Sequence, residues 1–145
     1  MTLFIVSIAI ALGVSFLCSI MEAALLSITP SKIAVIAERF PATGRICREF
    51  RKDIEKPIAV ILILNTAAHT FGASIAGAEF DELFGNRYIW IFSLAFTVMM
   101  VQYTEILPKT LGVRFNLPVM AYTARTLKFL VWLMRPLIAL VHLIN

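Results

Sequence analysis

The sequence predicts an all-α membrane protein with three transmembrane helices, short cytoplasmic helices after the first span, and a kinked amphipathic helix after the third. Two observations predict this class. Hydrophobic residues make up 60% of the 145 residues and charged residues only 15%, which is well outside the usual composition of soluble domains. The charges are also confined to a few segments, and they leave three uncharged runs that are each close to the length of a membrane span, about 20 residues.

The first span is expected over about residues 3–27. Residues 1–21 contain no Lys, Arg, Asp or Glu, and they lack the basic n-region of a cleaved signal peptide. Near the end of this run, Ser15, Ser19 and Glu22 are spaced i, i+4 and i+7, which places two hydroxyls and a carboxylate on one helical face. We expect that face to point into a helix bundle.

A charged segment follows the first span. Residues 32–56 hold seven basic and four acidic residues, and the interleaved signs argue against a nucleic-acid partner. Pro41 and Gly44 interrupt the helical pattern. We therefore expect two short cytoplasmic helices over residues 31–55.

The second span is expected over residues 57–78, which are 22 residues without a formal charge. It starts at Pro57, a residue that suits the first turn of a helix. Ala68, Gly72 and Ala76 form a ladder of small residues that allows close approach of another backbone. This pattern predicts tight helix packing.

Two polar residues lie within the second span, Asn65 and His69, at i, i+4 spacing. They would lie on the same helical face as Gly72. Either residue can be part of a functional site. The alternative for both is a structural role, in which each side chain bonds across to a neighbouring helix.

The third span, over about residues 88–107, ends in a carboxylate. Seventeen uncharged residues lead to Glu105, and Pro108 follows three residues later. An ionisable group at membrane depth costs a few kcal/mol, and a proline there frees backbone carbonyls, so the combination indicates a site. The alternative is that Glu105 lies at the headgroup level and pairs with Lys109, four residues later.

The distribution of loop charges predicts orientation. The link over residues 79–87 holds three acidic residues and one basic residue, in contrast to the basic segment 32–56. Positive loops stay on the cytoplasmic side. We therefore expect a multi-pass protein of the plasma or inner membrane, with its N-terminus outside and its C-terminus in the cytoplasm.

Residues 117–145 are long enough to span a membrane but contain Arg125, Lys128 and Arg135. At about 100° per residue these three side chains gather on one side of a helix, while most leucines lie elsewhere. We expect juxtamembrane helices that lie in the cytoplasmic interface, kinked at Pro136. A fourth span, with the C-terminus outside, is the alternative.

Three short motifs carry a family resemblance: SIMEAALLS at residues 19–27, ILILNT at 61–66 and EILPKT at 105–110. In order and spacing they resemble the transmembrane domain of the CorC and cyclin M magnesium transporters, and the resemblance covers essentially the whole chain. Three positions depart from the family pattern, which has glycine, asparagine and glycine there: Ile20, Thr66 and Thr104.

The resemblance implies a homodimer with three spans per subunit, a belt of juxtamembrane helices and a magnesium site between the spans. Ser19, Asn65 and Glu105 would be the metal ligands, one from each span, because their oxygen atoms suit a hard cation. The resemblance also implies Na⁺ as coupling ion. Relatives carry CBS-type regulatory domains on the cytoplasmic side, and this sequence contains none.

Two classes of function remain at this stage. The first is transport of Mg²⁺ by alternating access, coupled to Na⁺. The second is a non-transporting dimeric membrane anchor or regulator, whose polar residues only hold helices together. An enzyme is not expected, because the sequence shows no serine, cysteine or aspartate constellation with a base.

Overall fold

The computed structural model describes residues 2–144 and, within them, every side chain except those of residues 3 and 140–144. The described chain is helical from end to end, without a strand. In chain order, the elements are α1 (Thr2–Ser27), α2 (Pro30–Arg39), α3 (Pro41–Lys52), α4 (Glu55–Phe84), η1 (Asn86–Tyr88), α5 (Ile89–Met100), η2 (Val101–Ile106), α6 (Leu107–Arg114), α7 (Asn116–Leu133) and α8 (Arg135–Ile144).

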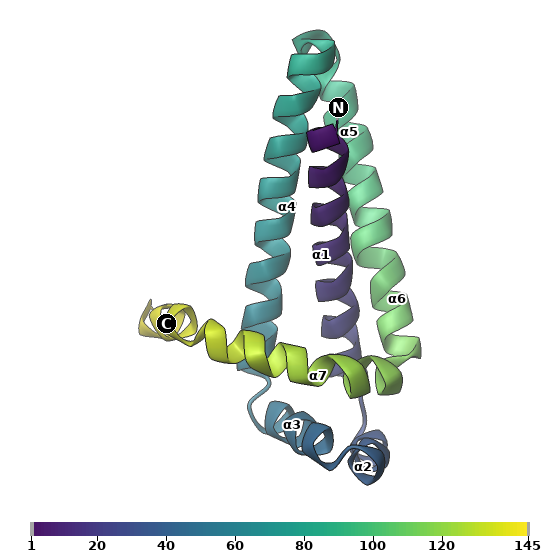
Figure 1. Ribbon diagram of the computed structural model, residues 1–145, viewed down its shortest axis with the longest axis vertical. Coiled ribbons are helices and arrows are strands. Elements are labelled where there is room, and N and C mark those ends of the chain that lie inside the picture. Colours follow the sequence, from purple (N-terminus) through teal and green to yellow (C-terminus); the bar gives the residue numbers. More distant parts are fainter. Residues whose placement is uncertain (1, 145) are drawn as a thin grey trace.

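Three helical segments are long and apolar enough to cross a membrane, namely Phe4–Ser27, Glu55–Phe84 and Asn86–Arg114. α1 stands between α4 on one side and α5 with α6 on the other (Figure 1). The first span therefore has a neighbour along two of its faces. The predicted class of an all-α membrane protein is confirmed.

The second of these helices is longer than expected. α4 continues through Glu79 and two further acidic residues to Phe84, whereas the sequence predicted a span that ends at residue 78. It stops at Gly85, whose φ of 77° costs a glycine little and a residue with a Cβ much more. The acidic residues after residue 78 end the apolar run, but the helix continues through them.

The third segment is not a uniform α-helix. α5 passes into η2, a π-helix of six residues, before α6 begins. At its end the Leu107 N–H bonds to the Gln102 carbonyl, five residues back. Pro108 then brings no N–H, so it donates no backbone hydrogen bond to the preceding turn. The disturbance expected around Glu105 and Pro108 is present, and it has the form of a π-turn.

At the foot of the spans, α7 runs across the bundle and α2 and α3 lie beneath it (Figure 1). α7 and α8 are separated at Met134, two residues before Pro136, which confirms the predicted kink. Residue 145, the last of the predicted juxtamembrane segment, lies outside the described residues. α7 crosses the feet of the spans (Figure 1) and is not among the three segments that are long and apolar enough to cross a membrane.

The charged segment forms two short helices, as predicted, and the break between them lies at Pro41. α2 ends at Arg39, Phe40 follows as its cap, and Pro41 opens α3. Gly44 lies inside α3, where an added Cβ would collide with Ala37 of α2. This glycine therefore allows two helices to approach each other instead of interrupting one.

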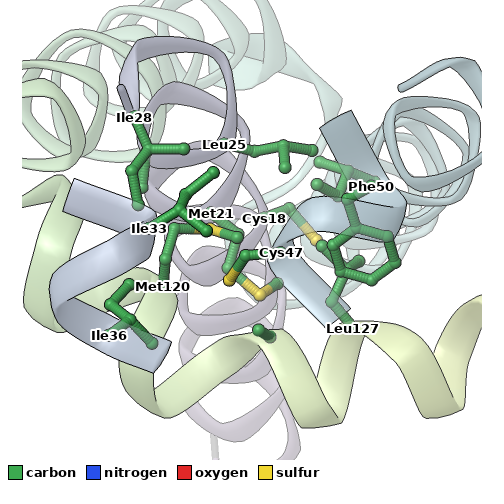
Figure 2. Packing of buried hydrophobic residues seen from close by; sticks show 13 residues of the cluster. Cys18, Met21, Leu25, Ile28, Ile33, Ile36, Cys47, Phe50, Met120 and Leu127 are labelled. Atoms are coloured by element: carbon green, nitrogen blue, oxygen red, sulfur yellow. The ribbon is translucent and has the colours of Figure 1, made fainter. Parts of the chain in front are cut away.

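The main hydrophobic cluster lies where α1, α2, α3 and α7 meet (Figure 2). Its largest members are Met21 and Leu25 from α1, Ile28 from the link that follows it, Ile33 and Ile36 from α2, Phe50 from α3, Ile61 from α4, and Met120 and Leu127 from α7. The cluster anchors the lower half of α1. It thereby fixes the position of the polar face that α1 presents to the other spans.

Small residues set the spacing of the spans. A Cβ at Gly72 of α4 would collide with Ala11 of α1, and a Cβ at Gly112 of α6 would lie 2.5 Å from the Ile20 carbonyl oxygen and 2.8 Å from the Ala23 Cβ. The small-residue ladder of the second span thus packs against α1 of the same chain. Both outer spans approach α1 at glycines.

Candidate metal site

The polar face of α1 points into the bundle, as predicted. Ser15 and Ser19 are both fully buried. Ser15 Oγ donates a hydrogen bond of 2.6 Å to Asn65 Oδ1 on α4. Ser19 Oγ has no hydrogen-bond partner among the described residues. A buried hydroxyl without a partner costs about 1–3 kcal/mol, which a bound ion or water would relieve.

His69 connects all three spans. Its Nε2 contacts Ser15 Oγ of α1 and lies 3.2 Å from Thr104 Oγ1 of η2. Its Nδ1 lies 3.9 Å from Glu105 Oε1. The imidazole therefore bonds across to two neighbouring helices and brings Glu105 into the same cluster as Asn65.

Glu105 does not pair with Lys109. The Lys109 ammonium lies 3.4 Å from Glu22 Oε2 instead, and the Glu22 side chain is only 16% exposed. Glu105 itself is 40% exposed and projects from the π-turn η2. The alternative in which Glu105 pairs with Lys109 is wrong, and the carboxylate of Glu105 faces no Lys or Arg among the described residues.

The structure brings two of the three predicted ligands into one cluster. Asn65 and Glu105 are linked through Ser15 and His69, whereas Ser19 lies one turn further along α1 and bonds to neither. Within the described residues, no three His, Cys, Asp or Glu side chains gather closely enough to hold a metal. A cation here would therefore depend on hydroxyl, amide and backbone oxygens as well.

Three members of the cluster were not among the predicted ligands: Ser15, His69 and Thr104. Ser15 was visible in the sequence as the first residue of the i, i+4, i+7 pattern on α1. Thr104 gave no separate signal, because a threonine within an apolar helix most often bonds to its own backbone. It does so here too, donating to the Met100 carbonyl at 2.7 Å, and its lone pairs remain for His69.

The family model of the cyclin M transmembrane N-terminal domain matches residues 6–145. The chain belongs to this family. A UPF0053 protein of Synechocystis is 28% identical over 141 residues, which cover 97% of this chain and 41% of that protein. A chloroplastic DUF21 domain-containing protein of Arabidopsis thaliana is 27% identical over 106 residues, which cover 73% of this chain and 16% of that protein. The chain thus spans less than half the length of these relatives.

One departure of this cyclin M domain from the motif pattern lies in the site, and a second lies where α1 and α6 approach each other. Thr104, in place of glycine, is buried and fills the space beside His69 with a hydroxyl. Ile20, also in place of glycine, is only half-buried, and the close approach of α1 and α6 at its carbonyl is permitted by Gly112. Thr66, in place of the second asparagine, is exposed and has no role in the cluster.

Proposed function

We propose that this cyclin M domain carries Mg²⁺ across the membrane at a site formed by Ser19, Asn65 and Glu105, with Na⁺ as the coupling ion and a homodimer as the working unit. The observation that carries the proposal is the environment of Glu105. A carboxylate within a membrane-spanning segment, half-exposed and without a Lys or Arg partner among the described residues, is expensive unless a cation neutralises it.

The donor set suits a hard cation that keeps part of its hydration. Mg²⁺ takes about six oxygen ligands at about 2.1 Å and retains several waters. Ser19 would supply a hydroxyl that has no other described partner, and Asn65 Oδ1 retains a lone pair beside its bond from Ser15. Pro108 supplies no backbone N–H, so a carbonyl of the preceding turn would be available to the ion, and Glu105 would supply the formal charge. One carboxylate gives moderate affinity, which suits a carrier that must release its ion.

The charges of the helices at the foot of the spans support a cytoplasmic position for them. Residues 32–56 carry seven basic and four acidic residues, against one basic and three acidic residues at 79–87. The protein would lie in a plasma or inner membrane. Single cysteines at the exposed positions Asn86 and Arg45 test this: in intact cells an impermeant maleimide should label Asn86→Cys and not Arg45→Cys. Labelling of Arg45→Cys and not of Asn86→Cys would show that the protein has the opposite orientation in the membrane.

A non-transporting dimeric anchor or regulator is the second candidate. It is favoured by the internal bonds of Ser15, His69 and Thr104, which join the spans without any ion. The two candidates differ in a direct test. If the domain is a transporter, Mg²⁺ should raise the melting temperature of the purified protein saturably, and proteoliposomes should show Mg²⁺ flux above empty liposomes. An anchor would show neither effect.

A further inference from the structure

The bonding around His69 determines which ring nitrogen carries the proton. Ser15 Oγ donates to Asn65 Oδ1 at 2.6 Å, and Thr104 Oγ1 donates to the Met100 carbonyl at 2.7 Å. Both hydroxyls therefore present only lone pairs to His69 Nε2, the atom that contacts them. Nε2 must be the donor. In a neutral imidazole the other nitrogen, Nδ1, then holds a lone pair.

That lone pair faces a carboxylate. His69 Nδ1 lies 3.9 Å from Glu105 Oε1. Two acceptors that face each other repel unless a metal cation or a proton lies between them. A divalent ion bound at about 2.0–2.2 Å by an imidazole nitrogen and a carboxylate oxygen separates those two atoms by roughly 3–4 Å, depending on the coordination angle. The observed separation therefore admits a shared metal ion with little movement of either side chain.

Other features of the cluster favour a metal ion at this point. His69 and Glu105 are 29% and 40% exposed, so an ion can reach both side chains. Among the described residues, only His69 lies within ion-pair distance of Glu105, because the Lys109 ammonium is held by Glu22. The bond from Nε2 to the two hydroxyls is the kind of outer-shell contact that orients a ligating histidine and fixes its tautomer.

We propose that His69 binds the transported ion through Nδ1 alongside Glu105, and that the site therefore binds divalent transition metals such as Co²⁺, Ni²⁺ or Zn²⁺ more tightly than Mg²⁺. Imidazole nitrogen suits these ions, whereas Mg²⁺ strongly prefers oxygen. This inference rests on the proposed function, because it uses the same carboxylate, and it specifies the substrate class. Mg²⁺ would be carried where transition metals are scarce.

The test compares Co²⁺ and Mg²⁺ binding to the purified protein by calorimetry, for the unmodified chain, His69→Gln and His142→Gln. The glutamine amide can still donate to Ser15 and Thr104 while removing the nitrogen ligand, and His142 is the other histidine of the sequence. We expect Co²⁺ to bind the unmodified chain at least about tenfold more tightly than Mg²⁺. His69→Gln should remove that difference by weakening Co²⁺ binding about tenfold, with Mg²⁺ affinity changed less than about threefold. His142→Gln should behave as the unmodified chain.

Two outcomes would overturn the inference. In the first, the Co²⁺ affinity of His69→Gln lies within about twofold of that of the unmodified chain. In the second, His69→Gln weakens the binding of Co²⁺ and Mg²⁺ equally, which would indicate a packing role or a bound proton in place of a metal. X-ray absorption of Co²⁺-loaded His142→Gln needs no change at His69; one imidazole should be present in the metal shell, and an all-oxygen shell would contradict the assignment. Glu105→Gln separates the two proposals. If it loses Mg²⁺ binding while His69→Gln leaves the preference unchanged, only the role of His69 fails.

Discussion

The Lys109 ammonium lies 3.4 Å from the Glu22 carboxylate, on a neighbouring helix, rather than beside Glu105 four residues earlier on its own segment. The pair ties α6 to α1 near the foot of the bundle. The pair also has an electrostatic effect, because it keeps the positive charge of Lys109 away from the Glu105 carboxylate, which we propose binds the ion. Because Lys109 pairs with Glu22, the Glu105 carboxylate is left available to bind a cation.

This relationship leads to the first prediction. Glu22→Gln should release Lys109, which can then turn toward Glu105, and Mg²⁺ affinity should fall by about three- to tenfold. The double variant Glu22→Gln with Lys109→Gln should recover most of the lost affinity, because no competing cation remains. Calorimetric titration of both variants measures this. Equal losses in the single and double variants would mean that Glu22 contributes to ion binding directly.

A second prediction concerns the packing of α4 on α1. Gly72→Ala should destabilise the protein by roughly 1–3 kcal/mol, because the added methyl collides with Ala11 in a packed interface. Gly77→Ala is the matched control on the same helix, since a Cβ there meets nothing within 4 Å, and alanine is the better helix former. Thermal unfolding in detergent gives the comparison. Equal melting temperatures for the two variants would be evidence against close packing at Gly72.

A third prediction concerns pH and the contact between α3 and α7. Lys128 Nζ donates a 2.7 Å hydrogen bond to Glu49 Oε2, and this bond lowers the pKa of the Glu49 carboxyl below its usual value. A carboxyl with a lowered folded-state pKa stabilises the protein above its unfolded-state pKa, about 4.3. That stabilisation is lost as the pH falls through the folded-state value.

The corresponding measurement is the melting temperature as a function of pH for the unmodified chain and Glu49→Gln. The variant should melt slightly lower at pH 7, and the difference should shrink as the pH falls below the unfolded-state pKa, about 4.3, because Glu49 is then increasingly protonated in the unfolded chain. The effect should be small, since both side chains are about half exposed. Glu38→Gln, at an exposed position of α2, is the control. A difference that persists unchanged at pH 3 would rule out the ion pair as its cause.

Much of the fold was accessible from the sequence, because charge-free runs of membrane length and breaks at proline are local signals. Pro108 predicted a disturbed helix, but the π-turn depends on the register in which carbonyls find donors, which the sequence does not specify. Gly44 was expected, together with Pro41, to mark the break between two short helices. It packs against Ala37 instead, and a glycine needed for close approach has the same local signature as one that ends a helix.

The candidate site was predictable only in part. The spacing of Ser15, Ser19 and Glu22 correctly predicted a buried polar face on α1. Which residues of α4 and η2 meet that face depends on how each helix is rotated about its axis, and a single sequence does not contain that rotation. The contacts of His69 with Ser15 and Thr104 therefore appear only in the structure.

The central claim is that the charge of Glu105 holds the transported ion, and Glu105→Gln in proteoliposomes tests it most directly. The substitution keeps the size of the side chain and one carbonyl oxygen while it removes the charge. Equal insertion of the variant and the unmodified protein is verified first. Mg²⁺ flux should then fall to the level of empty liposomes, and Mg²⁺ should no longer raise the melting temperature. Ser19→Ala should retain part of the flux and of the thermal stabilisation, because water can replace one oxygen ligand. Near-normal Mg²⁺ flux through the Glu105→Gln protein would contradict the claim and place the ion elsewhere.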